Sequence, residues 1–191
     1  MFVEVKGIKV KIENDSLNLS SLQIDNFSQV QGLGELTNLK SLILFNNNIS
    51  NIKNLDNLVK LEKLNLYGNK IEEITGLENL KNLRILYLSN NKIKEIKGLE
   101  QLTLLENLSF EDNNIKEIKG LNTLINLISL NLYGNSITTI EGLECLKKLK
   151  NFRIGNNPIP HNIIEEYGGI DEKGYALNPQ KFVNSHRINL N

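Results

Sequence analysis

The chain has 191 residues with 22 basic and 22 acidic side chains, so its balanced charge gives no reason to expect nucleic acid or an anionic membrane as a partner. It contains 33 Leu and 31 Asn but a single Ala, which argues against a helical bundle, because helix surfaces need strong helix formers. The 40% hydrophobic content excludes a disordered chain. Apolar runs stay well short of the roughly 18 residues that a membrane-spanning helix requires.

The first predicted element is a β-hairpin over residues 2–13. Apolar residues alternate with charged ones on both sides of a Lys6-Gly7 turn: Val3, Val5, Ile8, Val10 and Ile12. We assign residues 1–16 to an N-terminal cap. This segment lacks the apolar stretch of a signal peptide, and the lone Cys145 cannot form an internal disulfide. We therefore expect a cytoplasmic protein.

Residues 17–159 follow a repeat of 22 residues. The clearest column contains Leu39, Leu61, Leu83, Leu105, Leu127 and Leu149. The unit reads L-x-x-L-x-L-x-x-N-x-I-x-x-I-x-G-L-x-x-L, and an earlier coil of 25 residues begins near Leu17. Such a period is the signature of a repeat architecture in which each coil stacks on its neighbours. We count about seven coils.

The L-x-L step of each repeat predicts a short strand, because residues two apart face the same side of a strand. Stacked coils pair these strands into a parallel sheet and bury the leucines in one continuous core. The predicted strands lie at Leu17, Leu42, Leu64, Leu86, Leu108, Leu130 and Phe152. The fold class is therefore an α/β repeat solenoid.

One polar column stands among the apolar ones. It contains Asn47, Asn69, Asn91, Asn113, Asn135 and Asn157, which we call the Asn ladder. An Asn side chain has both a donor and an acceptor, so it can satisfy backbone groups where the chain turns away from the sheet. A second column, Gly76, Gly98, Gly120 and Gly142 with Asn54 in the same position, fits a turn that needs positive φ.

The repeat ends after Pro158, and residues 160–191 are assigned to a C-terminal helical cap and tail. A short helix over residues 160–167 is expected to end at Gly168-Gly169. A second helix is expected to start at Asn178-Pro179 and to pack Phe182 and Val183 on the last coil. The segment after Ile188 is expected to fray.

The unit at residues 86–107, LYLSNNKIKEIKGLEQLTLLEN, carries a family resemblance. It resembles leucine-rich repeats of the subclass that includes a regulatory subunit of type 1 protein phosphatase, and it is similar to axonemal dynein light chain and internalin repeats. The resemblance covers about residues 17–159. It implies a horseshoe with its parallel sheet on the concave face, short helical or 3-10 turns on the convex face, and a partner protein bound on the concave sheet.

Candidate binding residues follow from the strand positions that point away from the core. On neighbouring strands ~4.8 Å apart, they form a patch of Ile43, Phe45, Tyr67, Ile85 and Tyr87, with Glu111, Tyr133 and Arg153 in a more polar C-terminal half. Exposed aromatic clusters are enriched at protein interfaces. The alternative is that β-sheets favour such residues for their own stability.

Other constellations give weaker signals. The column Glu73, Glu95 and Glu117 invites a metal-site hypothesis, but flanking lysines favour charge pairs between coils, and we assign no metal site. His161, His186 and Cys145 form no recognisable catalytic set, so we expect no enzymatic activity and no cofactor.

The sequence thus favours a protein-interaction scaffold that is monomeric on its own and binds another protein, with no role for nucleic acid or membrane. Two alternatives stay open at this stage. One is a regulatory subunit that docks on an enzyme such as a protein phosphatase, and the other is an extracellular adhesion or ligand-binding module.

Overall fold

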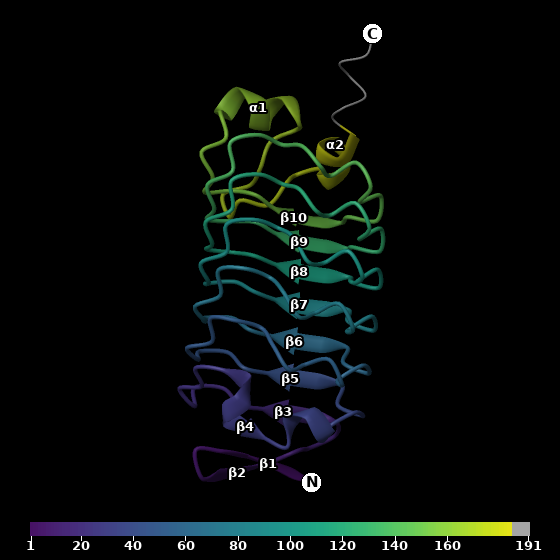
Figure 1. The fold of residues 1–191 in the computed structure, drawn as a ribbon. Helices are drawn as coiled ribbons and strands as arrows, with labels where there is room; N and C mark the ends of the chain where they lie inside the picture. The colour runs from purple at the N-terminus through teal and green to yellow at the C-terminus, as the bar shows by residue number, and fades with distance from the viewer. Residues whose placement is uncertain (185–191) are drawn as a thin grey trace.

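Each repeat forms one coil, and successive coils stack along the long axis of the molecule (Figure 1). The computed structural model describes residues 1–184. The strands that run up the stack are β3 (Ser16–Asn18), β5 (Ser41–Ile43), β6 (Lys63–Asn65), β7 (Ile85–Tyr87), β8 (Asn107–Ser109), β9 (Ser129–Asn131) and β10 (Asn151–Arg153).

These strands form one parallel sheet in the order β10-β9-β8-β7-β6-β5-β3. The register places Leu42 beside Leu64, and Leu64 beside Leu86, so the inward leucines lie in line from coil to coil. The seven strands predicted from the L-x-L steps are confirmed, as is the solenoid architecture.

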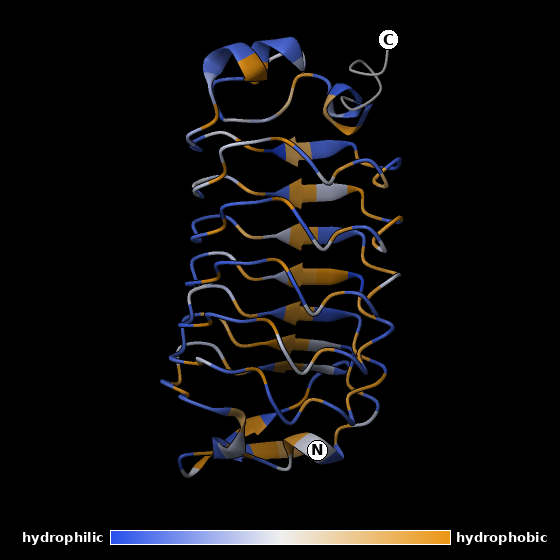
Figure 2. Cartoon of the chain, turned by 45° about the horizontal axis from the view of Figure 1, so that its top comes forward, coloured by the Kyte–Doolittle hydropathy of each residue, from blue (hydrophilic) through white to orange (hydrophobic). Residues whose placement is uncertain are grey.

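The core is one continuous cluster that extends from Val3 in the first strand to Val183 in the last helix. The inward Leu and Ile columns of the repeats are almost completely buried. In Figure 2, hydrophobic segments recur at matching places in successive coils. Each coil buries its apolar side chains only by stacking on its neighbours, which explains why the strands can be as short as three residues.

The side opposite the sheet contains few helices. Two 3-10 helices, η1 (Phe27–Gln29) and η2 (Leu33–Glu35), lie in the long first coil. Later coils have successive single turns instead, such as those closed by Leu58 N–H to Leu55 O and by Leu61 N–H to Leu58 O, both at 2.9 Å. The three-residue spacing of these buried leucines matches one such turn each, and a 22-residue coil leaves no room for a longer helix.

The N-terminal hairpin consists of β1 (Phe2–Val5) and β2 (Ile8–Lys11), which pair antiparallel around Lys6 and Gly7, both with positive φ. The sequence did not reveal that β1 also pairs with β4 (Val30–Gln31), giving a three-stranded sheet in the order β2-β1-β4. Val3 and Val5 are buried, so this sheet covers the first coil of the core.

The C-terminal end is covered by α1 (His161–Glu166) and α2 (Pro179–Asn184). Phe182 of α2 packs edge-on against Phe152, with ring centroids 5.5 Å apart. Between the helices, the Ala176 N–H donates to the Phe152 carbonyl at 2.8 Å, and the Gly174 carbonyl accepts from Ile154 at 2.9 Å. These bonds cover the edge of β10, which would otherwise present unpaired backbone groups.

The domain boundaries at residues 16 and 159 stay a prediction, and the expected fraying after Ile188 lies outside the described residues. Within residues 1–184, both α-helices are six residues long, and no helix has the length and apolar character that crossing a membrane would require.

Candidate functional site

The concave face of the sheet presents three rows of outward side chains. The first and third residues of each strand supply two rows, and the residue two positions after each strand supplies the third. In the register of the sheet, Ser41, Lys63 and Ile85 lie side by side in the first row. The second row contains Ile43, Asn65, Tyr87, Ser109, Asn131 and Arg153. The third row contains Phe45, Tyr67, Ser89, Glu111, Tyr133 and Gly155.

The five apolar candidates lie together in the N-terminal half of this face, on β5, β6 and β7 and the residues that follow them. Tyr67 is 43% exposed, and the others are half-buried: Ile43, Phe45, Ile85 and Tyr87. We call these five residues the aromatic patch. The patch is not uniformly apolar, because Asn65 stands between Ile43 and Tyr87 in the register. The Lys63 ammonium lies 5.9 Å from the centre of the Tyr87 ring.

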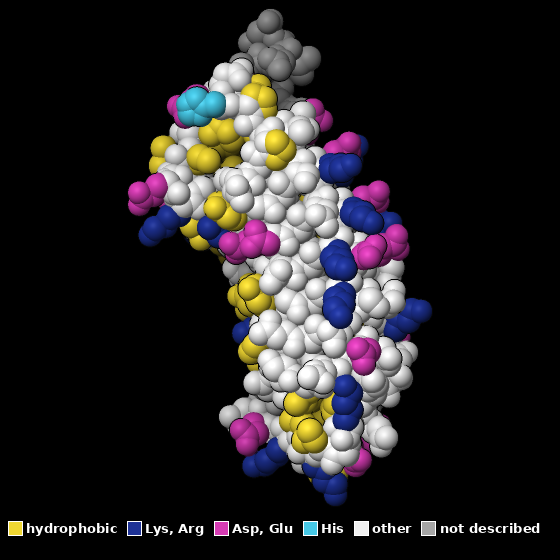
Figure 3. Space-filling model, turned by 90° about the vertical axis from the view of Figure 1, so that its left-hand side faces the viewer, with side chains coloured by type: hydrophobic (Ala, Val, Ile, Leu, Met, Phe, Trp, Pro, Cys, Tyr) yellow, Lys and Arg dark blue, Asp and Glu magenta, His cyan; other side chains and the backbone are white. Residues whose placement is uncertain are grey.

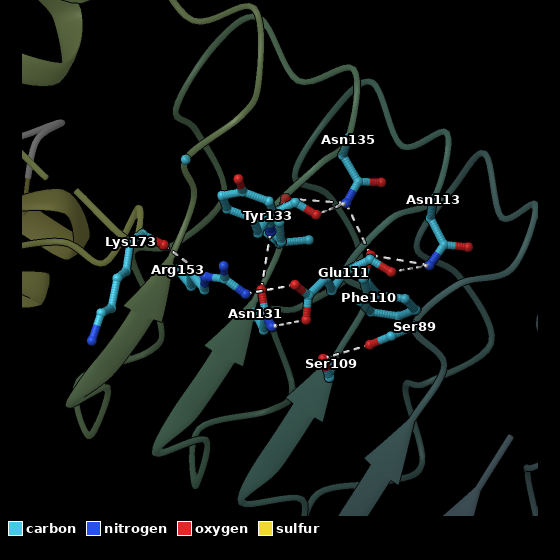
Figure 4. Close-up of polar contacts among 12 residues, drawn as sticks. Ser89, Ser109, Phe110, Glu111, Asn113, Asn131, Tyr133, Asn135, Arg153 and Lys173 are labelled. Carbon is cyan, nitrogen blue, oxygen red and sulfur yellow. Dashed lines mark hydrogen bonds and ion pairs between the residues drawn. The ribbon is translucent and has the colours of Figure 1, made fainter. Parts of the chain in front are cut away.

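The polar candidates in the C-terminal half contact one another (Figure 4). Arg153 donates from Nη1 to Glu111 Oε1 at 2.6 Å and from Nε to the Lys173 carbonyl at 2.8 Å. Its guanidinium lies 3.9 Å from the centre of the Tyr133 ring and 5.4 Å from that of Tyr175. Planar guanidinium groups combine stacking and directed hydrogen bonds in this way.

Glu111 is held from a second side, because Asn131 Nδ2 donates to Glu111 Oε2 at 3.0 Å. The side chains of Arg153 and Glu111 are 19% and 31% exposed. Since Lys173 and Tyr175 belong to the C-terminal cap, the network joins the cap to the concave sheet. Glu111, Tyr133 and Arg153 thus have a structural role that the sequence did not reveal. Because these side chains already contact one another, they are less available to a partner than the side chains of the aromatic patch.

Each side chain of the Asn ladder both accepts and donates hydrogen bonds that connect its coil to the preceding one. Asn113, for example, accepts from the Ile93 N–H of the preceding coil at 3.0 Å, and it donates to the Leu88 and Phe110 carbonyls, each at 3.0 Å. The same pattern recurs at the other ladder positions, Asn47, Asn69, Asn91, Asn135 and Asn157. The ladder residues lie inside the coil, so they hold the concave strands in place rather than contact a partner.

Two columns turn the backbone through positive φ. The Gly column does so with φ of +71° to +77°, and Asn54 takes its place at +61°. A second column was missed: Asn46, Gly68, Asn90, Asp112, Gly134 and Asn156 also have positive φ. Gly, Asn and Asp tolerate this region best, so their recurrence just before the Asn ladder was the available signal.

The predicted Glu column forms ion pairs with lysines. Figure 3 shows acidic and basic side chains interspersed along one side of the stack. Lys97 Nζ lies 3.6 Å from Glu73 and 3.5 Å from Glu95, while Lys119 pairs with Glu117. The hydrogen bond and charge of Glu117 raise the pKa of the Lys119 ammonium above its ordinary 10.5. A raised pKa favours the charged form, so this contribution to stability is complete below pH 10.5 and is lost as the pH rises further. Pairs this exposed contribute little to folding.

The remaining candidates for chemistry lie apart from one another. Cys145 is an exposed free thiol in the repeats. His161 begins α1 and lies 3.9 Å from Glu165. His186 lies outside the described residues.

Comparison with known proteins agrees with the observed architecture. A family model described as leucine rich repeats, with two copies in each match, covers residues 37–79, 81–123 and 125–166. No curated protein matches the chain.

Three solved structures are similar. Internalin C2 of Listeria monocytogenes is 28% identical with a TM-score of 0.60, over 76% of this chain and 73% of that one. The internalin inlF of the same bacterium is 30% identical with a TM-score of 0.56, over 74% of this chain and 48% of that one. A leucine-rich-repeat protein of Leptospira interrogans is 32% identical with a TM-score of 0.65, over 75% of this chain and 37% of that one.

The chain therefore spans less than half the length of the last two structures. These similarities do not select the subclass of the phosphatase regulatory subunit, which stays a prediction. The repeat pattern, the stacked parallel strands and the family model that matches most of the chain agree: this protein belongs to the leucine-rich-repeat family.

Proposed function

We propose that this protein is a non-enzymatic scaffold that binds a partner protein through the aromatic patch on its concave sheet. Leucine-rich-repeat proteins generally act in protein–protein interaction. The observation that carries the proposal is the outward position of three aromatic side chains in adjacent coils, Tyr87 on β7 and Phe45 and Tyr67 two residues beyond β5 and β6, where none of them belongs to the buried core. Aromatic side chains in such positions supply much of the binding free energy at interfaces.

The backbone under this surface is rigid before a partner binds. The strands under the patch are fixed by the parallel ladder, and the backbone beyond them is fixed by the Asn ladder of the same coils. A partner therefore meets a preformed surface and does not lose free energy to ordering the backbone of the scaffold.

A double substitution tests the proposal. The wild-type chain, a Phe45→Ala, Tyr87→Ala variant and a Val59→Ala, Ile125→Ala variant are immobilised and exposed to extract of the source cell. Val59 and Ile125 are exposed apolar residues in loops outside the sheet, so they control for general loss of hydrophobic surface.

We expect a protein retained by the wild type and by the loop variant to be lost from the patch variant, while all three melt at similar temperatures. Full retention by the patch variant would refute the proposed site. The identity of the retained protein then decides between a free-standing scaffold and a subunit that docks on an enzyme.

We further propose that the protein is located in the cytoplasm, and its monomeric state stays a prediction. The support is the single cysteine, an exposed thiol that a reducing compartment keeps unoxidised. Fractionation of the source cell with an antibody against the chain tests the location: we expect the cytoplasmic fraction, and recovery from the medium or the cell surface would contradict it.

A further inference from the structure

The concave face carries few charges, and they are unevenly distributed. Its three rows contain three charged residues on the strands β5–β10 and the positions that follow them: Lys63, Glu111 and Arg153. Glu111 and Arg153 neutralise each other across a 2.6 Å ion pair. Among residues 1–184, Lys63 has no carboxylate within ion-pair distance, even though Glu62 is its neighbour in the chain.

Lys63 lies at the margin of the aromatic patch, in the first row between Ser41 and Ile85. It is paired with Ile85 across the sheet, and its ammonium lies 5.9 Å from the centre of the Tyr87 ring. The Lys63 side chain is already half-buried, whereas Tyr67 on the same coil remains 43% exposed. A partner that covers the face of the Tyr87 ring therefore also removes water from the ammonium beside it.

This geometry restricts the partner. Removing an ammonium from water without an opposite charge or acceptor is strongly unfavourable, so a purely apolar partner would bind this patch poorly. A carboxylate placed opposite Lys63 compensates for the lost water and forms a charge-assisted hydrogen bond. A basic partner is excluded by like-charge repulsion.

We propose that the aromatic patch recognises a protein segment in which a single Asp or Glu side chain is flanked by apolar side chains, with the carboxylate bound by Lys63 and the apolar groups by Phe45, Tyr67 and Tyr87. This inference rests on the proposed function, because it specifies the chemistry of the partner for the same surface. Lys63 sets the specificity, and the aromatic rings supply the contact area.

Selection from a phage-displayed library of random peptides tests the inference. Peptides are selected on the wild-type chain, and those that no longer bind the Phe45→Ala, Tyr87→Ala variant are defined as patch-directed. The same library is selected on Lys63→Glu, which reverses the charge, and on Lys53→Met, a control at an exposed lysine outside the sheet.

We expect patch-directed peptides to share an acidic residue next to apolar ones on the wild type and on Lys53→Met, and to carry Lys or Arg at that position on Lys63→Glu. In a selected peptide, exchange of the acidic residue for its amide should weaken binding about tenfold or more. The same exchange should have little further effect on Lys63→Met, which keeps the length of the side chain but removes its charge.

The outcomes separate the two proposals. Patch-directed peptides without an acidic residue, or binding that is unchanged by Lys63→Met, would overturn the role of Lys63 and leave the proposed binding surface standing. A library that yields no patch-directed peptide would count against the surface itself, and the inference about Lys63 would fail with it.

Discussion

One side chain in each coil, the amide of the Asn ladder, connects that coil to the one before it. The Asn113 oxygen and nitrogen bond three backbone groups at 3.0 Å: the Ile93 N–H and the Leu88 and Phe110 carbonyls. These groups lie beyond the last residues of β7 and β8, so the strand ladder does not satisfy them. Buried backbone groups without partners are rare in folded proteins because each is costly.

Replacement of Asn113 by Ala leaves the buried Ile93 N–H without its acceptor, whereas the Leu88 and Phe110 carbonyls each keep a second ladder donor, Asn91 and Asn135. We expect the free energy of unfolding in urea to fall by about 1–3 kcal/mol. The matched control is Asn114→Ala, at the exposed residue that follows, where the change should stay within about 0.5 kcal/mol. Equal effects at the two positions would contradict the role assigned to the ladder.

The Gly column allows successive coils to approach closely. Gly120 has a φ of +75°, and a Cβ atom there would lie 2.2 Å from the Ile96 carbonyl oxygen of the preceding coil. Gly120→Ala should therefore lower the melting temperature. The left-handed backbone alone should reduce the free energy of unfolding by at least about 1–2 kcal/mol.

Gly34→Ala provides the comparison for Gly120→Ala, because Gly34 has ordinary φ and its nearest neighbour would be 3.9 Å from the new Cβ atom. For Gly34→Ala we expect the free energy of unfolding to stay the same or to rise by up to about 1 kcal/mol. A Gly120 variant as stable as the Gly34 variant would show that the coils can separate without cost.

At the level of elements, the sequence predicts the strands and turns that recur in every repeat. Six strands of the large sheet follow from columns that repeat every 22 residues, and β3 follows from the same L-x-L step 25 residues earlier. Their register follows because equivalent residues pair, as Leu42 and Leu64 do. The hairpin and both C-terminal helices were also predictable, because Lys6-Gly7, Gly168-Gly169 and Asn178-Pro179 are local turn and helix signals.

Contacts that occur once carry no such signal. The pairing of β1 with β4 joins segments about 26 residues apart, and the cover of β10 by residues 174–176 depends on an irregular loop. The Arg153–Glu111 pair spans 42 positions in the chain and two strands of the sheet. Sequence reasoning placed Glu111, Tyr133 and Arg153 on the correct face, but it could not show that they contact one another.

The Arg153 network should stabilise the C-terminal cap locally. Lys cannot stack between Tyr133 and Tyr175 as a planar guanidinium does, so Arg153→Lys should weaken the contact with residues 173–175. We expect faster hydrogen exchange at the Ile154 and Gly155 amides, which donate to the Gly174 carbonyl, by the equivalent of about 1–2 kcal/mol.

Arg84→Lys is the control for the cap experiment, because Arg84 is in an exposed pair with Glu106 and does not touch the cap. Its exchange pattern at Ile154 and Gly155 should match the wild type. Unchanged exchange in Arg153→Lys as well would show that the backbone bonds hold the cap without the side-chain network.

At the level of the whole molecule, the two halves of the concave face differ in use. The C-terminal half is internally paired and holds the cap, whereas the N-terminal half presents the aromatic patch and the Lys63 ammonium, which has no carboxylate partner among residues 1–184. This asymmetry locates the proposed binding function in three neighbouring coils, those of β5, β6 and β7, of the seven that contribute a strand to the large sheet. The rest of the solenoid supplies the core that keeps those coils in register.

Site-specific photo-crosslinking tests this central claim most directly. A benzophenone amino acid replaces Tyr67 in the patch, or Ile125 in a loop outside the sheet, both being exposed positions. After irradiation in the source cell, we expect a discrete crosslinked product with a partner protein from position 67 and none of that product from position 125. The same product from both positions, or from position 125 alone, would contradict binding through the concave aromatic patch.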